Sequence, residues 1–327
     1  MHIPDHYLSP STCAVLAAAM LPVWGWAGGR VKRELSRKKI PYIGVGAAFS
    51  FLIMMVNLPL PGGTSGHAVG AALAAILWGP AFAVISTSVA LAIQALVFGD
   101  GGILAFGANC FNMAFAMPLI AYGLFKLIGG RNAGPKRKSI AAFIAGYVSL
   151  NAAAFLTSLE FGIQPLLFTD KAGLPLYGPY GLDVAIPAMM IPHLLVIGIV
   201  EGLVTAGVYR YVSKASPDFL YEGSRKSLKT AYLYLGGLLA LTPLGLLAAG
   251  TAWGEWGTDE IRSLLGFIPQ GMKSGMNWRA PFTDYSLTGI HQIAGYLMSG
   301  VIGVLLIGLM IWLAGKLSTA KTDESRE

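Results

Sequence analysis

The first two residues of the chain, Met1 and His2, bring together donor atoms that could bind a metal. They place an α-amine, a backbone amide nitrogen and an imidazole next to one another. Once the amide loses its proton, these three nitrogens can close two fused chelate rings in one plane. Square-planar nitrogen coordination selects nickel(II) or copper(II), whereas zinc prefers tetrahedral sites and magnesium prefers oxygen ligands. The alternative is that His2 belongs to a frayed terminus and has no ligand.

The best candidate for a fourth planar nitrogen is His67, which follows the Gly-rich turn Pro61-Gly62-Gly63-Thr64-Ser65-Gly66. Such a turn can deliver an imidazole to the start of a helix, although a histidine there can equally be a polar cap. Ser9 and Pro10 are typical of an N-cap and the first helical position, so the preceding arm is expected to lie against a helix. The large His2 side chain favours retention of Met1, which would keep the α-amine available as a ligand.

The composition indicates an integral membrane protein. The chain of 327 residues is 55% hydrophobic and 12% charged, with a mean hydropathy of +0.63. Soluble domains carry about 25% charged residues. The net charge of +7 resides in loops between apolar runs, which is a topology signal and does not indicate nucleic acid binding. No cleavable signal is evident, and the two cysteines, Cys13 and Cys110, lie in apolar stretches and predict no disulfide framework.

The apolar runs predict an all-α polytopic bundle of about nine transmembrane helices. The third and fourth runs are short for a bilayer of about 30 Å, which a helix crosses with roughly 20 residues. The third, which starts at His67, is therefore expected to be tilted or buried against other helices. The nine expected spans cover about 10–28, 41–58, 67–78, 80–98, 103–128, 140–159, 185–211, 231–252 and 289–315.

The basic loops predict that the N-terminus lies outside the cell. Lysine and arginine gather at 30–39, 131–138 and 209–229, and two further lysines, Lys316 and Lys321, follow the last expected span. With the N-terminus outside, all of these fall on the cytoplasmic side, as the positive-inside rule requires. The same orientation places Met1, His2 and the His67 loop on the outer face. Candidate ligands that are far apart in sequence would therefore meet on one side of the membrane.

Other residues carry weaker functional hypotheses. Glu201 lies within the seventh expected span, where a carboxylate suggests a transport role. It is near the cytoplasmic end of that span, so snorkelling or pairing with an arginine is the favoured alternative. His193 is expected to form a hydrogen bond inside the bundle rather than to bind a metal, while His6 and His291 are further candidate ligands on the outer side.

The motifs that are missing exclude several classes of catalysis. The chain has no His-Glu-x-x-His pair and no Gly-x-Ser-x-Gly turn. The stretch nearest to a phosphate-binding loop, 129–135, has a proline where lysine is required. The chain is therefore not expected to be an enzyme or to hydrolyse ATP. Pumping would take its energy from a partner or from an ion gradient.

Several motifs together resemble the NikM/CbiM family, whose members are the nickel- and cobalt-specific substrate-capture (S) components of energy-coupling factor (ECF) transporters. The similarity is carried by Met1-His2-Ile3-Pro4-Asp5, Leu8-Ser9-Pro10, the turn ending at His67, Phe98-Gly99-Asp100-Gly101-Gly102, and Gly107-Ala108-Asn109-Cys110-Phe111-Asn112-Met113. The resemblance implies high-affinity capture of nickel(II), with cobalt(II) as a second substrate, by the Met1 amine, the His2 amide and imidazole nitrogens and His67. It also implies a scaffold T component (NikQ/CbiQ-like), cytoplasmic ATPases (NikO/CbiO-like) and a place in the plasma membrane of a prokaryote.

The resemblance divides the chain into a metal-binding bundle at 1–212, a cytoplasmic linker at 213–228 and an accessory two-helix module at 229–327. The last region is similar to the NikN/CbiN type, because Phe282-Thr283-Asp284-Tyr285-Ser286 is similar to a short Asp-Tyr motif there. One departure is His6, which stands where the family commonly has glycine; it could tighten the turn of the arm or add an axial donor.

Two rival hypotheses have different requirements. An ion-coupled secondary transporter that needs no ATPase could use Glu201 as its proton site. A membrane enzyme would need a catalytic pair, and the sequence offers none. The donor chemistry alone would suit copper as well as nickel, and only the resemblance disfavours copper.

Overall fold

The structure, a computed structural model, describes residues 1–34, 40–60, 64–130, 132–215, 225–248, 252–274 and 278–323. Several sequence features lie outside the described residues: much of the first basic loop, the start of the turn that precedes His67, Arg131, most of the predicted linker, and the end of the chain. Their positions are 35–39, 61–63, 131, 216–224, 249–251, 275–277 and 324–327.

The described part of the chain is mostly helical and contains six helices that are long and apolar enough to cross a bilayer. They span Pro10–Arg33, Pro80–Phe98, Phe106–Gly129, Pro135–Leu167, Leu182–Ala215 and Gln292–Lys316. Two shorter apolar helices, Pro41–Met54 and Ala231–Leu247, coincide with two further expected spans. The multi-pass membrane class therefore agrees with the sequence, whereas nine spans and an external N-terminus stay predictions.

The expected span at 67–78 is wrong in its extent. Residues 67–70 are not helical, and α3 covers only Ala71–Trp78. Eight residues rise about 12 Å, well short of a bilayer core. Residues Ala71–Leu77 are all buried, so α3 is an internal helix of the bundle. Its apolar composition reflects burial among other helices, and composition alone cannot distinguish such a helix from a lipid-facing one.

A short β-hairpin, which the all-α prediction did not include, precedes α3. Strand β1 (Leu58–Leu60) pairs antiparallel with β2 (Thr64–Gly66), with Leu58 opposite Gly66. The hairpin ends at Gly66, directly before His67. The residues taken for a flexible turn therefore include a paired segment, which fixes where the His67 backbone begins.

Three of the long helices contain a π-helical segment. Helix α4 (Pro80–Ile93) continues into η2 (Gln94–Phe98), α5 (Phe106–Asn109) into η3 (Cys110–Ala116), and α9 (Leu182–Pro192) into η4 (His193–Ile197). Such segments are frequent at functional sites because they redirect side chains. Here Gln94 begins η2 and Asn109 ends α5, and both side chains are buried next to the N-terminal arm.

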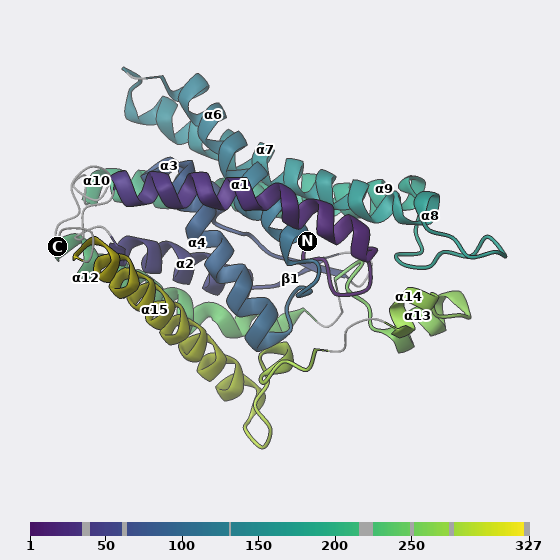
Figure 1. The fold of residues 1–327 in the computed structure, drawn as a ribbon. Coiled ribbons are helices and arrows are strands. Elements are labelled where there is room, and N and C mark those ends of the chain that lie inside the picture. Colours follow the sequence, from purple (N-terminus) through teal and green to yellow (C-terminus); the bar gives the residue numbers. More distant parts are fainter. Residues whose placement is uncertain are drawn as a thin grey trace.

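The remaining elements complete the bundle. They are α1 (Pro10–Glu34), α2 (Ile40–Met54), α6 (Met117–Gly129), α7 (Pro135–Gly162), α8 (Gln164–Leu167), α10 (Gly198–Ala215), α12 (Arg225–Leu241), η5 (Thr242–Leu247), α13 (Thr258–Leu265), α14 (Gln270–Ser274), η6 (Thr283–Tyr285) and α15 (Gln292–Asp323). Helix α7 packs against α6, α9 and α10, and α4 packs against α1, α2 and α3. In Figure 1 the N-terminus lies among these helices near β1.

Candidate metal site

The N-terminal arm is docked inside the protein by hydrogen bonds to its backbone. The Ile3 amide donates to Asn109 Oδ1 (2.8 Å), and the Ile3 carbonyl accepts from Asn109 Nδ2 (3.0 Å) and from the Gly102 amide (2.8 Å). Met1, His2 and Ile3 are at most 4% exposed. Buried backbone groups require such partners, so the Asn109 amide substitutes for a neighbouring strand. The arm is therefore an ordered segment and not a frayed terminus.

The rest of the arm is held in the same way. The Asp5 carboxylate accepts from the amides of Ile103 (3.1 Å) and Leu104 (2.8 Å). The Ser9 amide donates to Gln164 Oε1 (2.9 Å), and the Thr12 amide donates to the Ser9 hydroxyl (3.1 Å). The latter bond is the N-cap of α1, as the sequence predicted. These contacts align the arm from the start of α1 back to residue 1.

A substitution at Gly102 should displace the arm. A Cβ at Gly102 would overlap the backbone of Pro4 and Asp5. We expect Gly102→Ala to destabilise the docked arm by about 1–3 kcal/mol, as overpacking does elsewhere, and so to weaken metal binding by roughly 5- to 150-fold. Titration calorimetry with nickel measures the affinity. Gly123→Ala is the matched control because Gly123 has open space around it and lies in α6; equal affinities in the two variants would contradict the close fit.

His2 and His67, which are 65 positions apart, meet in the interior of the protein. His2 Nδ1 lies 3.2 Å from His67 Nε2, and the ring centroids are 4.9 Å apart. Metal–nitrogen bonds of about 2 Å place neighbouring donors of a square plane about 2.8 Å apart. The two imidazole nitrogens are thus close to the separation that two adjacent ligands of one ion require.

Both imidazoles are in the neutral form that a metal ligand needs. Burial lowers the pKa of His2 to about 3, and the nearby N-terminal amine acts in the same direction. Burial and the neighbouring His2 lower the pKa of His67 as well. His67 Nδ1 lies 3.1 Å from the Ala68 carbonyl and donates to it in the tautomer that this contact favours. The Nε2 lone pair of His67 then points toward His2.

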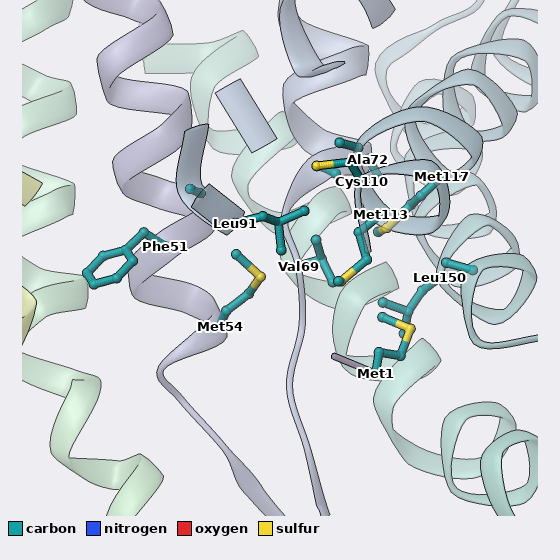
Figure 2. Packing of buried hydrophobic residues seen from close by; sticks show 14 of the residues in the cluster. Met1, Phe51, Met54, Val69, Ala72, Leu91, Cys110, Met113, Met117 and Leu150 are labelled. Carbon is teal, nitrogen blue, oxygen red and sulfur yellow. The ribbon is translucent and has the colours of Figure 1, made fainter. Parts of the chain in front are cut away.

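The amine of Met1 lies beside a carboxylate from a distant part of the chain. Its nitrogen is 3.3 Å from Glu255 Oε1. The Met1 side chain reaches into the apolar cluster that includes Met113 and Leu150, which fixes the position of the residue (Figure 2). Burial raises the pKa of Glu255 and the Met1 amine opposes that shift. The buried amine therefore has a counter-charge when it carries a proton.

A second carboxylate, Asp100, contacts the same group of residues. Asp100 Oδ1 lies 3.0 Å from His2 Nδ1, and burial raises the pKa of Asp100. His2, His67, Asp100 and Glu255 together line a cavity of about 290 Å³. Among the described residues, no group of three or more His, Cys, Asp and Glu side chains is arranged to hold a metal.

The buried Glu201 holds the loop that carries His67. Its carboxylate accepts hydrogen bonds from the amides of Val69 (2.8 Å) and Gly70 (3.1 and 3.2 Å). These amides precede α3. A negative carboxylate at the start of a helix also interacts favourably with the positive end of the helix dipole. Sequence reasoning favoured snorkelling or an arginine partner for Glu201. The residue is instead fully buried and bound to backbone two and three positions after His67.

Replacing Glu201 should weaken metal binding through this loop. Glu201→Gln places an amide NH2 against backbone donors, and we expect the affinity for nickel to fall about 10–100-fold, as for other residues that orient a ligand. Glu160→Gln is the control, because Glu160 is also a buried carboxylate but accepts from Asn112, at 2.8 Å. An unchanged affinity with lost uptake would contradict a positioning role and favour the proton-site hypothesis.

The other histidines play different parts. His193 Nδ1 lies 2.6 Å from the Met189 carbonyl one turn earlier, which confirms the predicted hydrogen bond within the bundle. His6 has a φ of 76°, a left-handed conformation that favours glycine. This left-handed backbone is consistent with the expected part of His6 in the turn of the arm. His291 is an exposed residue just before α15.

Sequence reasoning did not assign roles to Asn109, Asp100 or Glu255. Asn109 and Asp100 belong to motifs that carry the family resemblance. The presence of a polar residue near glycines in each motif was the signal that could have pointed to a role in the site. Glu255 is one of several charged residues between the last two helices, and its sequence position offers nothing that connects it to Met1.

Comparison with known proteins gives the family to which the chain belongs. The sequence model of the family described as the cobalt uptake substrate-specific transmembrane region, CbiM, matches residues 2–219. The chain belongs to the CbiM family. A PDGLE domain model matches residues 226–320, so a second region follows the CbiM region in the same chain, as expected for a fused accessory module.

Individual relatives agree with this arrangement. The chain is 46% identical to the fused nickel transport protein NikMN of Rhodobacter capsulatus, over 97% of this chain and 98% of that one. It is 30% identical to the cobalt transport protein CbiM of Desulforamulus reducens, over 69% of this chain and 86% of that one. A crystal structure described as a transition metal transporter aligns with a TM-score of 0.63 and 50% identity, covering 72% of this chain and 99% of that one.

Proposed function

We propose that this CbiM-family chain captures nickel(II), and also accepts cobalt(II), with four nitrogens: the Met1 amine, the His2 amide nitrogen, His2 Nδ1 and His67 Nε2. The observation that carries the proposal is the 3.2 Å separation of His2 Nδ1 and His67 Nε2 next to the buried amine. The NikMN and CbiM relatives, which are named for nickel and cobalt transport, support the choice of metal.

Charge balance supports the same ligand set. Without metal, the ammonium form of Met1 gives the site one positive charge, since both imidazoles are neutral. A bound divalent ion adds two positive charges, while the amine loses a proton and the amide becomes negative, so the site again has one positive charge. The carboxyl groups of Asp100 and Glu255 therefore face the same net positive charge with and without bound metal. Binding exchanges two protons for one metal ion without leaving a new unbalanced charge in the interior.

The proposal assigns the chain the role of a substrate-binding component without an ATPase site of its own. ECF-type import would require a scaffold T component and cytoplasmic ATPases as partners, in the plasma membrane of a prokaryote with the metal site facing outward. The relatives named as transport proteins support a transport role, and the absence of a phosphate-binding loop from the sequence supports an external source of energy.

Nickel uptake by cells tests this proposal. Cells that express the chain with an ECF scaffold subunit and ATPases should accumulate radioactive nickel. Cells in which the ATPase cannot hydrolyse ATP should accumulate no more than cells without the chain. The ion-coupled alternative predicts the opposite: uptake would continue without ATP hydrolysis and would stop when the proton or sodium gradient is collapsed. Uptake that is independent of the ATPase would overturn the proposed function.

A further inference from the structure

A hydrogen-bonded cluster of three side chains lies against the His2 ring. Tyr285 donates its hydroxyl proton to Asp100 Oδ2 (2.6 Å), and Gln94 Nε2 donates to both Asp100 Oδ2 (3.0 Å) and the Tyr285 oxygen (2.9 Å). The other oxygen of Asp100 contacts His2 Nδ1 at 3.0 Å. The orientation of the Gln94 amide is thereby fixed: its nitrogen faces the other two members of the cluster.

The same cluster leaves two buried atoms unused. His2 Nε2 and Gln94 Oε1 both lack a hydrogen-bond partner among the described residues. The Gln94 side chain is nevertheless close enough to His2 to oppose the lowering of its pKa. Buried polar atoms without a partner are costly and call for an explanation. One of these atoms is a ring nitrogen that can carry a proton, and the other is an acceptor.

The two states of the site need different tautomers of His2. In the metal-free protein the contact with Asp100 favours a proton on Nδ1. A metal bound to Nδ1 needs the lone pair of that nitrogen, so the neutral ring must then carry its proton on Nε2. The ring stays neutral in both tautomers, and only the position of its proton differs. An acceptor beside Nε2 would stabilise the metal-binding tautomer.

We propose that Gln94 Oε1 accepts the Nε2 proton of His2 in the metal-bound state, and that Tyr285 acts as a positioning residue by holding the Gln94 amide in the required orientation. This inference rests on the proposed function and adds a part for the C-terminal region, from which Tyr285 comes. Ligand-binding histidines are commonly held through their second nitrogen in this way.

The backbone around Tyr285 is built to place that side chain. Asp284 and Tyr285 have φ values of 53° and 57°, which residues other than glycine rarely adopt. The Tyr285 ring stacks on Phe98, with centroids 4.8 Å apart, and the Phe282 amide donates to the Val97 carbonyl (3.0 Å). Phe98 and Val97 belong to η2, the segment that begins with Gln94. The C-terminal region thus docks on the element that carries Gln94.

Three full-length variants test the proposal by nickel titration in detergent. Gln94→Met removes both the acceptor and the amide at nearly the same volume, and Tyr285→Phe removes only the phenol oxygen. We expect affinity losses of about 10–100-fold and about tenfold, respectively. Tyr296→Phe is the matched control, because the Tyr296 hydroxyl donates to the Met55 carbonyl at 2.8 Å and not to the cluster. It should change the affinity less than about twofold. Equal affinities in all four proteins would overturn the inference.

The position of the proton gives a second readout that a purely structural effect would not change. Square-planar nickel(II) is diamagnetic, so nitrogen NMR of histidine-labelled protein can identify the protonated ring nitrogen. We expect His2 to carry its proton on Nδ1 without nickel and on Nε2 with nickel, and the Nε2 proton to exchange faster in Gln94→Met. A wild-type protein that binds no nickel would refute the proposed function itself. A wild-type protein that binds nickel but shows no difference from Gln94→Met in affinity and proton exchange would refute only the role of Gln94.

Discussion

The His2→Ala variant is expected to lose nickel affinity by roughly 1,000-fold or more. The substitution removes the His2 imidazole, which closes the second chelate ring and is one of the two imidazole ligands of the proposed site. This loss should exceed the 10–100-fold that is usual for residues outside the ligand shell. The fold should persist, because the arm is held mainly through the backbone of Ile3 and the Asp5 side chain. Isothermal titration of the purified protein measures the effect.

The neighbouring His6 provides the control for that variant. His6 lies on the same arm, and the contacts described above for the His2 and His67 rings do not involve it. His6→Ala should therefore bind nickel within about threefold of the wild type. A comparable loss in both variants would indicate that nickel is held by solvent-accessible imidazoles in general. A loss confined to His2→Ala, together with a similar loss in His67→Ala, is the pattern that the four-nitrogen site requires.

The affinity for nickel is expected to rise steeply with pH. Two protons leave when the metal binds, one from the Met1 ammonium and one from the His2 amide, so lowering the pH opposes binding. Release of two protons per metal means that the apparent association constant should rise about 100-fold per pH unit. The imidazoles should add no protons to this count between pH 5 and 7, because burial lowers the pKa of His2 to about 3 and also lowers that of His67.

Titrations in buffers with different ionisation enthalpies count the released protons directly. The expected value at pH 6 is close to two protons per nickel. A value close to zero would mean that only neutral groups bind the metal and would exclude the amine and the amide as ligands. A value near four would mean that both imidazoles are charged in the metal-free protein, contrary to their burial.

The local sequence was sufficient to predict the parts of the site that depend on neighbouring residues. Ser9 and Pro10 start α1 as predicted, and the paired types of Met1 and His2 suggested the chelate before any fold was known. The meeting of His2 with His67 was inferred from the family resemblance and from the side of the membrane on which both were expected. Membrane topology assigns residues to one side of the bilayer, but it does not specify the distance between two side chains.

The parts that sequence reasoning missed depend on contacts between distant segments. Asn109 pairs with Ile3 across 106 positions, and Glu255 meets Met1 across 254. Such contacts follow from how the helices pack, which hydropathy does not determine. The internal helix α3 was counted among the nine spans, and its burial among other helices is one of the two outcomes expected for so short a run; an apolar run looks the same whether protein or lipid surrounds it.

The most direct test of the site is the nickel content and visible spectrum of the purified chain, with and without three glycines added before Met1; a single added residue would itself create a chelate of one amine, two amides and the imidazole. Intact mass should first establish that Met1 is the first residue of the unmodified protein. We predict a yellow, diamagnetic complex with one nickel per chain, which disappears in the extended protein because the α-amine is no longer at Met1. Nickel retained by the extended protein with an unchanged spectrum would contradict the terminal-amine site.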